Sequence, residues 1–261
     1  MRLVCAQLDV VFGDPAANML VARQAMEANA DADFIVFPEA FLTGYCVDSL
    51  AEAEAIAVPF STACSLQEDV DRMGQTVVIG FLERDGDSLY NTAALLEPNV
   101  APRRYRKTHL PCMGIDRFVK AGDELPVFET RFGKVGILIC FDQRPPEATR
   151  SLALRGIDLL VLPTNWPEGA ETSAEYMPSA RAAENKIFVA TCNRAGSEAG
   201  FNFIGRSKIV APTGHIIASA DRAAGFISAD LDLALARQKR TVNVPGKYEI
   251  DIIGCRRPEL Y

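Results

Sequence analysis

Histidine is scarce in this sequence, and its cysteines lack the spacing of a metal site. The chain has 2 histidines, His109 and His215, and 7 cysteines, an odd number without any C-x-x-C pair. This pattern excludes a multi-histidine metal centre and argues against both a zinc site and a disulfide framework. We therefore predict no metal and free thiols in a reducing compartment.

The sequence also lacks a positive charge excess and a long apolar run. Its net charge is -7, whereas nucleic-acid binders usually carry clustered positive charge, so a small-molecule ligand is favoured over nucleic acid. Gln7, Asp9 and Asp14 interrupt the apolar N-terminal stretch before a signal-peptide core is complete, and no run is long enough to cross a bilayer. We expect a cytoplasmic protein with no membrane partner.

What is present is the pattern of a layered α/β protein. The chain is 49% hydrophobic and 23% charged, and its 261 residues suit a single domain over residues 1–261. The run KVGILIC, residues 134–140, is nearly continuously apolar and indicates a central strand. Apolar runs predict strands near residues 3–8, 34–37, 76–82, 89–96, 100–106, 127–130, 134–140, 158–162, 187–191, 203–210, 215–219 and 225–230. Capping and periodicity signals predict helices near residues 14–30, 49–73, 145–155 and 172–185. Strands and helices alternate first and strands crowd together later, which fits an α/β fold.

Three residues that follow predicted strands are candidates for chemistry. Cys140 ends a buried strand before a turn and a helix, whose N-terminus favours a nucleophilic thiolate; the alternative is an inert buried cysteine. Glu39 follows another buried strand, where apolar walls would raise its pKa and suit a general base; the alternative is a solvated or ion-paired glutamate. Lys107 would stabilise an oxyanion, unless the basic run 103–107 is a charged edge strand or a nucleic-acid patch.

The two histidines leave a further mechanism open. His109 could form a cysteine–histidine dyad with Cys140, in which the imidazole removes the thiol proton. The spacing neither supports nor excludes this dyad. His215 follows Pro212-Thr213-Gly214, a hairpin turn signal, and is expected on the surface.

Three motifs in the chain together resemble those of the nitrilase-like carbon–nitrogen hydrolases. They are FIVFPEAFLTGY at residues 34–45, YRKTHLP at residues 105–111 and GILICFDQRPPEATR at residues 136–150. Later segments, DLLVLPTNWP, FVATCNRAG and the closing RRPELY, also look like family features, so the resemblance covers essentially the whole chain. It implies a four-layer α-β-β-α sandwich, assembled as a homodimer or larger homo-oligomer.

The resemblance also implies roles for individual residues. Glu39 would be the general base, Lys107 the oxyanion stabiliser and Cys140 the nucleophile, with the backbone N–H of Phe141 as a second oxyanion donor and no cofactor. His109 would then not be the base. A binding or scaffold protein on the same fold remains the alternative from another class.

One feature departs from the family pattern. Many members carry a second active-site glutamate after the lysine motif, but here the segment MGIDRF offers only Asp116. Asp116 either replaces that glutamate with a shorter reach or caps a turn. Asp142, Glu147 and Arg150 are expected to pair within the surrounding helix and loops rather than to take part in the chemistry.

The substrate is predicted only as a class. Tyr45, Asn165 and Trp166 follow or lie near the strand ends that carry the catalytic groups, so they should line the pocket, although Trp166 could equally be a core residue. Phe141-Asp142 does not look like the Trp-Glu pair of true nitrilases. We favour a small primary amide or N-carbamoyl compound over a nitrile.

Overall fold

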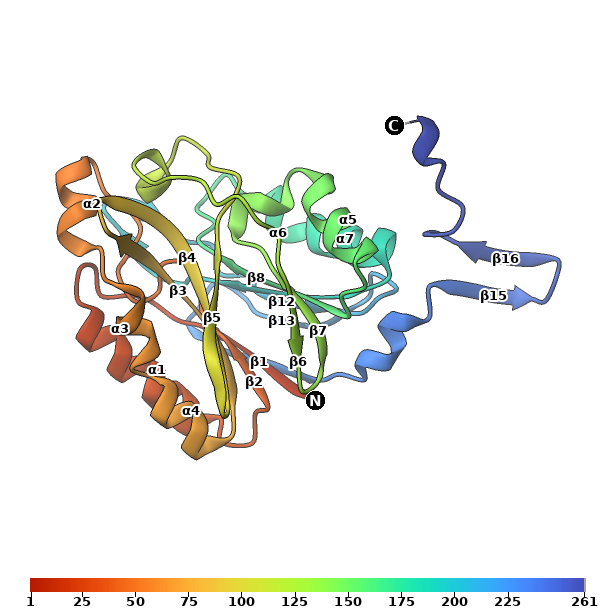
Figure 1. The fold of residues 1–261 in the computed structure, drawn as a ribbon, viewed down its shortest axis with the longest axis horizontal. Helices are drawn as coiled ribbons and strands as arrows, with labels where there is room; N and C mark the ends of the chain where they lie inside the picture. The colour runs from red at the N-terminus through yellow and green to blue at the C-terminus, as the bar shows by residue number, and fades with distance from the viewer. Residues whose placement is uncertain (261) are drawn as a thin grey trace.

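In residues 1–260, which the computed structural model describes, most strands belong to two 6-stranded sheets. The first sheet has the order β14-β1-β2-β3-β4-β5 and the second has the order β13-β12-β9-β8-β7-β6 (Figure 1). The first contains β1 (Arg2–Gln7), β2 (Phe34–Val36), β3 (Thr76–Asp85), β4 (Ser88–Glu97), β5 (Val100–Arg106) and β14 (Gly225–Asp230). The second contains β6 (Val127–Thr130), β7 (Gly133–Ile137), β8 (Leu159–Thr164), β9 (Phe188–Asn193), β12 (Lys208–Val210) and β13 (Ile216–Ser219).

Side-chain alternation along the first sheet produces two separate cores. In β1, Leu3 and Cys5 belong to a core shared with the second sheet, whereas Val4 and Ala6 belong to a core shared with helix α1. Because both faces are covered, the strands are apolar on both sides. The sheets therefore pack face to face through their inner faces.

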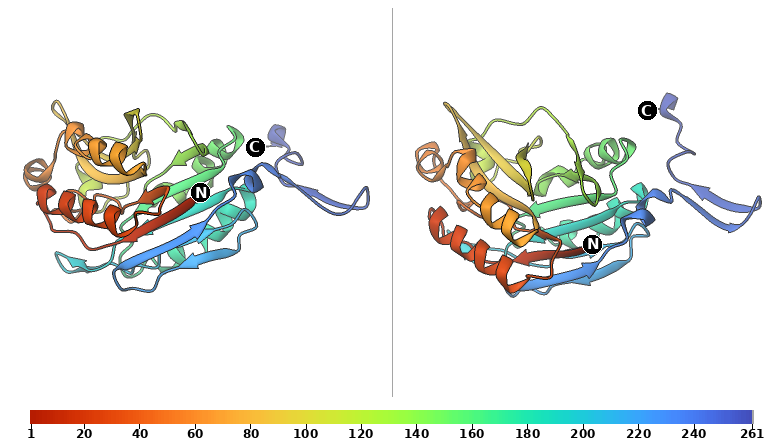
Figure 2. Two further views of the ribbon diagram at one scale, coloured as in Figure 1. Left: turned by 90° about the horizontal axis from the view of Figure 1, so that it is seen from below. Right: turned by 60° about the horizontal axis from the view of Figure 1, so that its bottom comes forward.

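Helices cover the outer face of each sheet and complete four layers. In the right-hand view of Figure 2, the red and orange helices line one side of the molecule; they are α1 (Pro15–Ala28), α2 (Leu50–Ile56), α3 (Phe60–Cys64) and α4 (Gln67–Met73). On the second sheet lie α5 (Pro146–Leu154), α6 (Glu171–Glu175) and α7 (Met177–Asn185). The predicted α-β-β-α sandwich is confirmed.

Several predicted elements differ in the structure. The helix expected at 49–73 is three short helices, because the chain bends at Val58 to bond with β3 before Pro59. The helix expected at 172–185 is broken at Tyr176, and the strand expected at 203–210 is only Lys208–Val210. The strand expected at 134–140 ends at Ile137; it is an interior strand of the second sheet, paired with β8 on one side and with the edge strand β6 on the other.

The chain continues beyond the last predicted strand. A hairpin of β15 (Arg240–Val244) and β16 (Tyr248–Asp251) follows β14, and Figures 1 and 2 show it reaching away from the two sheets. Small two-residue strands β10 (Ser197–Glu198) and β11 (Phe201–Asn202) were also not predicted. Among the described residues, no helix has both the length and the apolar character that crossing a bilayer requires.

The sheet topology brings distant segments to one end of the sandwich. β1, β2 and β3 are parallel, as are β7, β8 and β9. Glu39 follows β2, Cys140 follows β7, and Asn165 follows β8. Ligand sites of parallel sheets form at the carboxyl ends of their strands, and the predicted residues are found there.

Candidate active site

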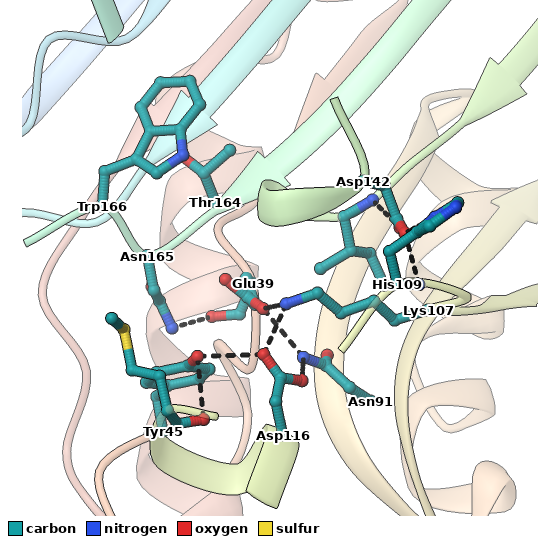
Figure 3. A network of polar contacts seen from close by, with 12 residues as sticks. Glu39, Tyr45, Asn91, Lys107, His109, Asp116, Asp142, Thr164, Asn165 and Trp166 are labelled. Atoms are coloured by element: carbon teal, nitrogen blue, oxygen red, sulfur yellow. Dashed lines mark hydrogen bonds and ion pairs between the residues drawn. The ribbon is translucent and has the colours of Figure 1, made fainter. Parts of the chain in front are cut away.

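Glu39, Lys107 and Asp116 form a buried ionic cluster (Figure 3). The Lys107 Nζ lies 2.7 Å from Glu39 Oε1 and 2.6 Å from Asp116 Oδ2, and none of the three side chains is exposed. Removal of such charges from water is costly unless they are paired and hydrogen-bonded, as they are here. The three predicted residues come from separate segments, so the cluster is a product of the tertiary fold.

The backbone around Glu39 is held by a close approach of β3. A Cβ atom on Gly80 would lie 2.6 Å from Pro38 O and from Ala40 N, and 2.8 Å from the Glu39 Cα. Ala40, directly after Glu39, has a left-handed φ of 49°. Non-glycine residues in this region are strained and persist only where the surrounding structure holds them. Gly80 and this strained turn together place the Glu39 side chain.

Cys140 begins a short 3₁₀ helix, Cys140–Gln143, directly after Ile139. Its φ of 47° is also left-handed, a strained conformation typical of sharp turns that present nucleophiles. Phe141 is the second residue of this helical turn, and the first N–H groups of a helix have no partner within it. Its backbone N–H is therefore suited to the predicted role of oxyanion donor.

Burial controls the proton affinities in the cluster. Burial raises the pKa of Glu39; the Lys107 charge lowers it and the Asp116 charge raises it further. Burial alone would lower the pKa of Lys107, but the Glu39 and Asp116 charges outweigh this effect and raise it. The ammonium is thus retained beside a carboxylate of increased basicity.

Burial also controls the proton affinity of Cys140. Burial and the Glu39 charge raise the pKa of the thiol, whereas the Lys107 charge and a hydrogen bond from the backbone of Asn165 only partly oppose them. The four-residue 3₁₀ helix does not overcome desolvation of the sulfur. The raised pKa favours the neutral thiol, which needs a base to remove its proton during attack.

Asp142 joins the nucleophile turn to the lysine loop. Its Oδ2 accepts hydrogen bonds from the Ile139 N–H at 2.9 Å and the Tyr105 hydroxyl at 2.7 Å. Its Oδ1 accepts the His109 N–H at 2.8 Å and lies 2.9 Å from His109 Nδ1. The expected pairing of Asp142 within loops is confirmed, but its partners are not Glu147 or Arg150. The structure gives His109 a positioning contact with Asp142, while Glu39 lies beside Lys107.

Asn91 is a member of the cluster that the sequence reasoning missed. It lies in β4 with 1% of its surface exposed, and its Nδ2 donates to Glu39 Oε1 at 2.8 Å and to Asp116 Oδ1 at 2.9 Å. A polar side chain inside the apolar strand expected at 89–96 was the available signal. Buried amides need partners, so an asparagine there indicates a polar network.

Asp116 is buried and has three contacts of its own. In addition to Lys107 and Asn91, the Tyr45 hydroxyl donates to Asp116 Oδ2 at 3.0 Å. The backbone of Tyr45 also holds this segment, because its carbonyl accepts the Ile115 N–H at 2.9 Å. Asp116 thus faces the ionic cluster, and the interpretation as a simple turn cap was wrong.

The predicted pocket residues surround a cavity of about 300 Å³. Tyr45, Asn165 and Trp166 line it together with Cys140 and Phe141. Asn165 also donates to the Glu39 backbone carbonyl at 2.9 Å. Trp166 is 97% removed from solvent, with 3% of its surface exposed, so it is a core residue whose face borders the cavity. A cavity of this size accepts a small molecule.

One further lining residue, Arg144, was not predicted. Its backbone carbonyl accepts a hydrogen bond from Arg181, and its side chain is exposed at the cavity wall. Among the ion pairs of the described residues, none includes the Arg144 guanidinium. No group of three or more His, Cys, Asp or Glu side chains within residues 1–260 is placed to hold a metal ion.

The fold and this cluster define a class, an α/β enzyme with its polar groups at the strand ends. A family model described as carbon-nitrogen hydrolase matches residues 2–241. A nitrilase of Pyrococcus abyssi is 34% identical, covering 100% of this chain and 99% of the relative. A 2-oxoglutaramate amidase of Bacillus subtilis is 32% identical, covering 90% and 92%.

A solved structure shares the fold. It is a mutant amidase from Nesterenkonia sp. with the acetamide moiety of fluoroacetamide on its active-site cysteine; the TM-score is 0.83 at 23% identity, over 100% of this chain and 95% of that one. The chain belongs to the carbon–nitrogen hydrolase family. It is an enzyme of the nitrilase superfamily that hydrolyses carbon–nitrogen bonds.

Proposed function

We propose that the enzyme hydrolyses a small primary amide through a thioester on Cys140. The observation that carries this proposal is the ion pair of Lys107 with Glu39 and Asp116, buried beside a cysteine that borders the cavity. A cation, a base and a thiol at one point are the groups that acyl transfer to sulfur needs. The covalent acetamide in the Nesterenkonia amidase is a property of that enzyme and supports the same chemistry here.

In the acylation step, Glu39 removes the proton from the Cys140 sulfur as the sulfur attacks the amide carbon. The carbonyl oxygen becomes an oxyanion, held by the Lys107 ammonium and the Phe141 backbone N–H. When the tetrahedral intermediate collapses, the carbon–nitrogen bond breaks and Glu39 gives its proton to the leaving nitrogen. Ammonia departs and a thioester remains.

In the second step, Glu39 removes a proton from water, and the resulting hydroxyl attacks the thioester carbon. The same two donors hold the second oxyanion. Collapse breaks the carbon–sulfur bond, and the sulfur recovers the proton from Glu39. One amide and one water thus give one carboxylic acid and one ammonia. Asp116 replaces the second glutamate of the family by holding Lys107 in place.

The favoured substrate carries a carboxylate as well as the amide. Arg144 places a positive charge on a cavity wall whose other charged lining residue, Glu168, is paired with Arg222 at 2.8 Å. Much of the remaining wall is apolar, at Pro111, Met113, Trp166 and Pro167. An unpaired guanidinium there is suited to bind a carboxylate by paired hydrogen bonds. The name of the Bacillus subtilis relative, 2-oxoglutaramate amidase, describes a substrate of this class. Substrates of this type have an amide at one end and an acid at the other.

Ammonia release tests the proposal. The panel contains amides with and without a carboxylate, N-carbamoyl amino acids and nitriles, each assayed with wild type and with Cys140→Ala. We expect release from carboxylate-bearing amides, abolished by Cys140→Ala. Release from nitriles alone would instead assign nitrilase activity, and release that survives Cys140→Ala would refute the thioester. The cytoplasmic location and homo-oligomeric state stay predictions.

A further inference from the structure

Asn91 contacts every charged member of the cluster. Its Nδ2 donates to Glu39 Oε1 at 2.8 Å and to Asp116 Oδ1 at 2.9 Å, and its backbone carbonyl accepts the Lys107 N–H at 2.8 Å. Figure 3 shows the amide lying between the two carboxylates. The strand β4, which contributes no residue to the proposed chemistry, therefore reaches the catalytic set through this one side chain.

The chemistry of the contacts fixes how Asn91 is oriented. Ionised carboxylates only accept hydrogen bonds, so the amide NH₂ must face them. Among the described residues, the Asn91 Oδ1 is buried without a partner, which is a cost accepted to keep the nitrogen between the carboxylates. The arrangement indicates that the two donated bonds are what matters.

The same contacts distinguish the two oxygens of Glu39. Oε1 receives bonds from both Lys107 Nζ and Asn91 Nδ2. Oε2 is buried and has no hydrogen-bond partner in the part of the chain that the structure describes. One oxygen is thus held by the protein while the other is left for a proton from outside the cluster.

We propose that Asn91 is a positioning residue that locks Glu39 through Oε1, so that Oε2 is the atom that takes the Cys140 proton. This inference rests on the proposed role of Glu39 as general base. Asn91 also favours the ionised form of Glu39, because its bond is made to the carboxylate. It thus supports both the geometry and the charge state of the base.

Other groups facing Glu39 decide how strongly the loss of Asn91 is felt. They are Lys107 after β5, Asp116 in the short helix at residues 114–117, Tyr45 in the loop after β2, and Cys140 after β7. Burial and the Asp116 charge raise the pKa of Glu39, whereas Lys107 and the Asn91 hydrogen bond lower it. Removal of Asn91 leaves only Lys107 in opposition, so that pKa rises further.

The experiment compares Asn91→Leu with Thr92→Val. Thr92 is the neighbouring residue in β4, fully buried, and its hydroxyl donates to Glu83 at 2.7 Å rather than to the cluster. For Asn91→Leu we expect the acidic limb of the kcat/KM profile to move to higher pH by about one unit, since a hydrogen bond to a charged group is lost. Thr92→Val should lower the unfolding temperature without moving that limb.

A second measurement needs no substrate. The rate at which iodoacetamide alkylates Cys140 is followed against pH, with Cys140→Ala as the blank, and its acidic limb should move in Asn91→Leu as the kcat/KM limb does. The smaller variant Asn91→Ser provides the same test if the leucine variant does not fold. Acidic limbs that stay at the wild-type pH in folded Asn91 variants would overturn the inference. Failure of the proposed function would appear separately, as wild type without turnover on the amide panel.

Discussion

The Lys107 ammonium and the Glu39 carboxylate lie 2.7 Å apart, and both side chains are completely shielded from solvent. Asp116 holds the same ammonium from another side, at 2.6 Å. The single cation therefore pairs with two buried carboxylates at once. This relationship makes Lys107 important for the stability of the fold as well as for the proposed oxyanion.

Substitution Lys107→Met should strongly destabilise the protein. It leaves Glu39 and Asp116 buried beside each other without a counter-charge, and breaking a buried ion pair from one side costs about 3–5 kcal/mol. The free energy of unfolding, measured in urea, should fall by that amount at pH 8 and by less at pH 5, where Glu39 takes up a proton more easily. Amide hydrolysis should be lost at both.

Lys134→Met is the control for Lys107→Met. Lys134 pairs with Glu129 at 3.1 Å, but 44% of the lysine side chain and 71% of the glutamate side chain are exposed. Exposed pairs contribute about 0–1 kcal/mol. If the two variants lost equal stability, the ionic cluster would contribute no more to the free energy of unfolding than an exposed ion pair does.

Gly80→Ala should reduce activity strongly, although the substitution adds only one methyl group. The added Cβ would lie 2.6 Å from Pro38 O, so β3 or the strained turn at residues 38–40 must move, and Glu39 moves with it. We expect kcat to fall by about 100-fold, since misplacement of a catalytic group by 1 Å has this effect. Overpacking should also cost about 1–3 kcal/mol of stability.

The control for Gly80→Ala is Gly86→Ala in the turn between β3 and β4. Gly86 has a φ of 58°, and nothing lies within 4 Å of an added Cβ. This change strains only the backbone, so stability should fall by about 1 kcal/mol while kcat stays at the wild-type value. Gly80→Ala with wild-type kcat would show that the approach of β3 does not position Glu39.

Much of the cluster could be predicted because its members directly follow apolar strands. Glu39 and Cys140 come after runs that the sequence shows clearly, and the carboxyl ends of parallel strands meet at one edge. Asn91 and Gly80 could not be assigned in this way. Their roles depend on which residues of β3 and β4 lie beside Glu39, and this register is decided by tertiary packing.

The errors in the fold have related causes. The interruption of the 49–73 helix could have been expected at Pro59, because the residue before a proline avoids helical geometry. The position of β7 beside the edge strand β6 could not have been expected, since an apolar run does not show which strands will lie next to it. In the hairpin of β15 and β16, the apolar side chains of Val242, Val244 and Tyr248 are exposed. The alternation of apolar and polar residues in this hairpin therefore does not mark a face that is buried in the main core.

His109 should contribute to stability in a pH-dependent manner without being the catalytic base. Its hydrogen bond with Asp142 raises the pKa of the imidazole above its usual 6.5. A raised pKa means that the stabilisation is complete below about pH 6.5 and is lost as pH rises through the folded-state pKa. The stability difference between wild type and His109→Asn should therefore be larger at pH 6 than at pH 9 in urea unfolding.

Activity of the same variant tests the histidine mechanism. Because the His109 ring is bound to Asp142, we expect His109→Asn to retain amide hydrolysis within about tenfold, while Glu39→Gln loses about 10²–10⁴-fold as the general base is removed. The reverse result, an inactive His109→Asn with an active Glu39→Gln, would support the cysteine–histidine dyad instead.

Arg144→Met should alter which amides are hydrolysed rather than how fast bound amides react. Arg144 lines the cavity, whereas the partners of Glu39 and Asp116 in the ionic cluster are Lys107 and Asn91, so its loss should remove binding of the substrate carboxylate and leave the acyl-transfer groups intact. Loss of a charge-assisted hydrogen bond is worth about 1.5–3 kcal/mol, which is about 10- to 100-fold in KM for carboxylate-bearing amides. Neutral amides of the same length should keep their wild-type KM, and Arg144→Lys should restore part of the affinity because the charge remains while the paired geometry is lost. Equal increases of KM for neutral and acidic amides would show that Arg144 shapes the cavity without binding the substrate carboxylate.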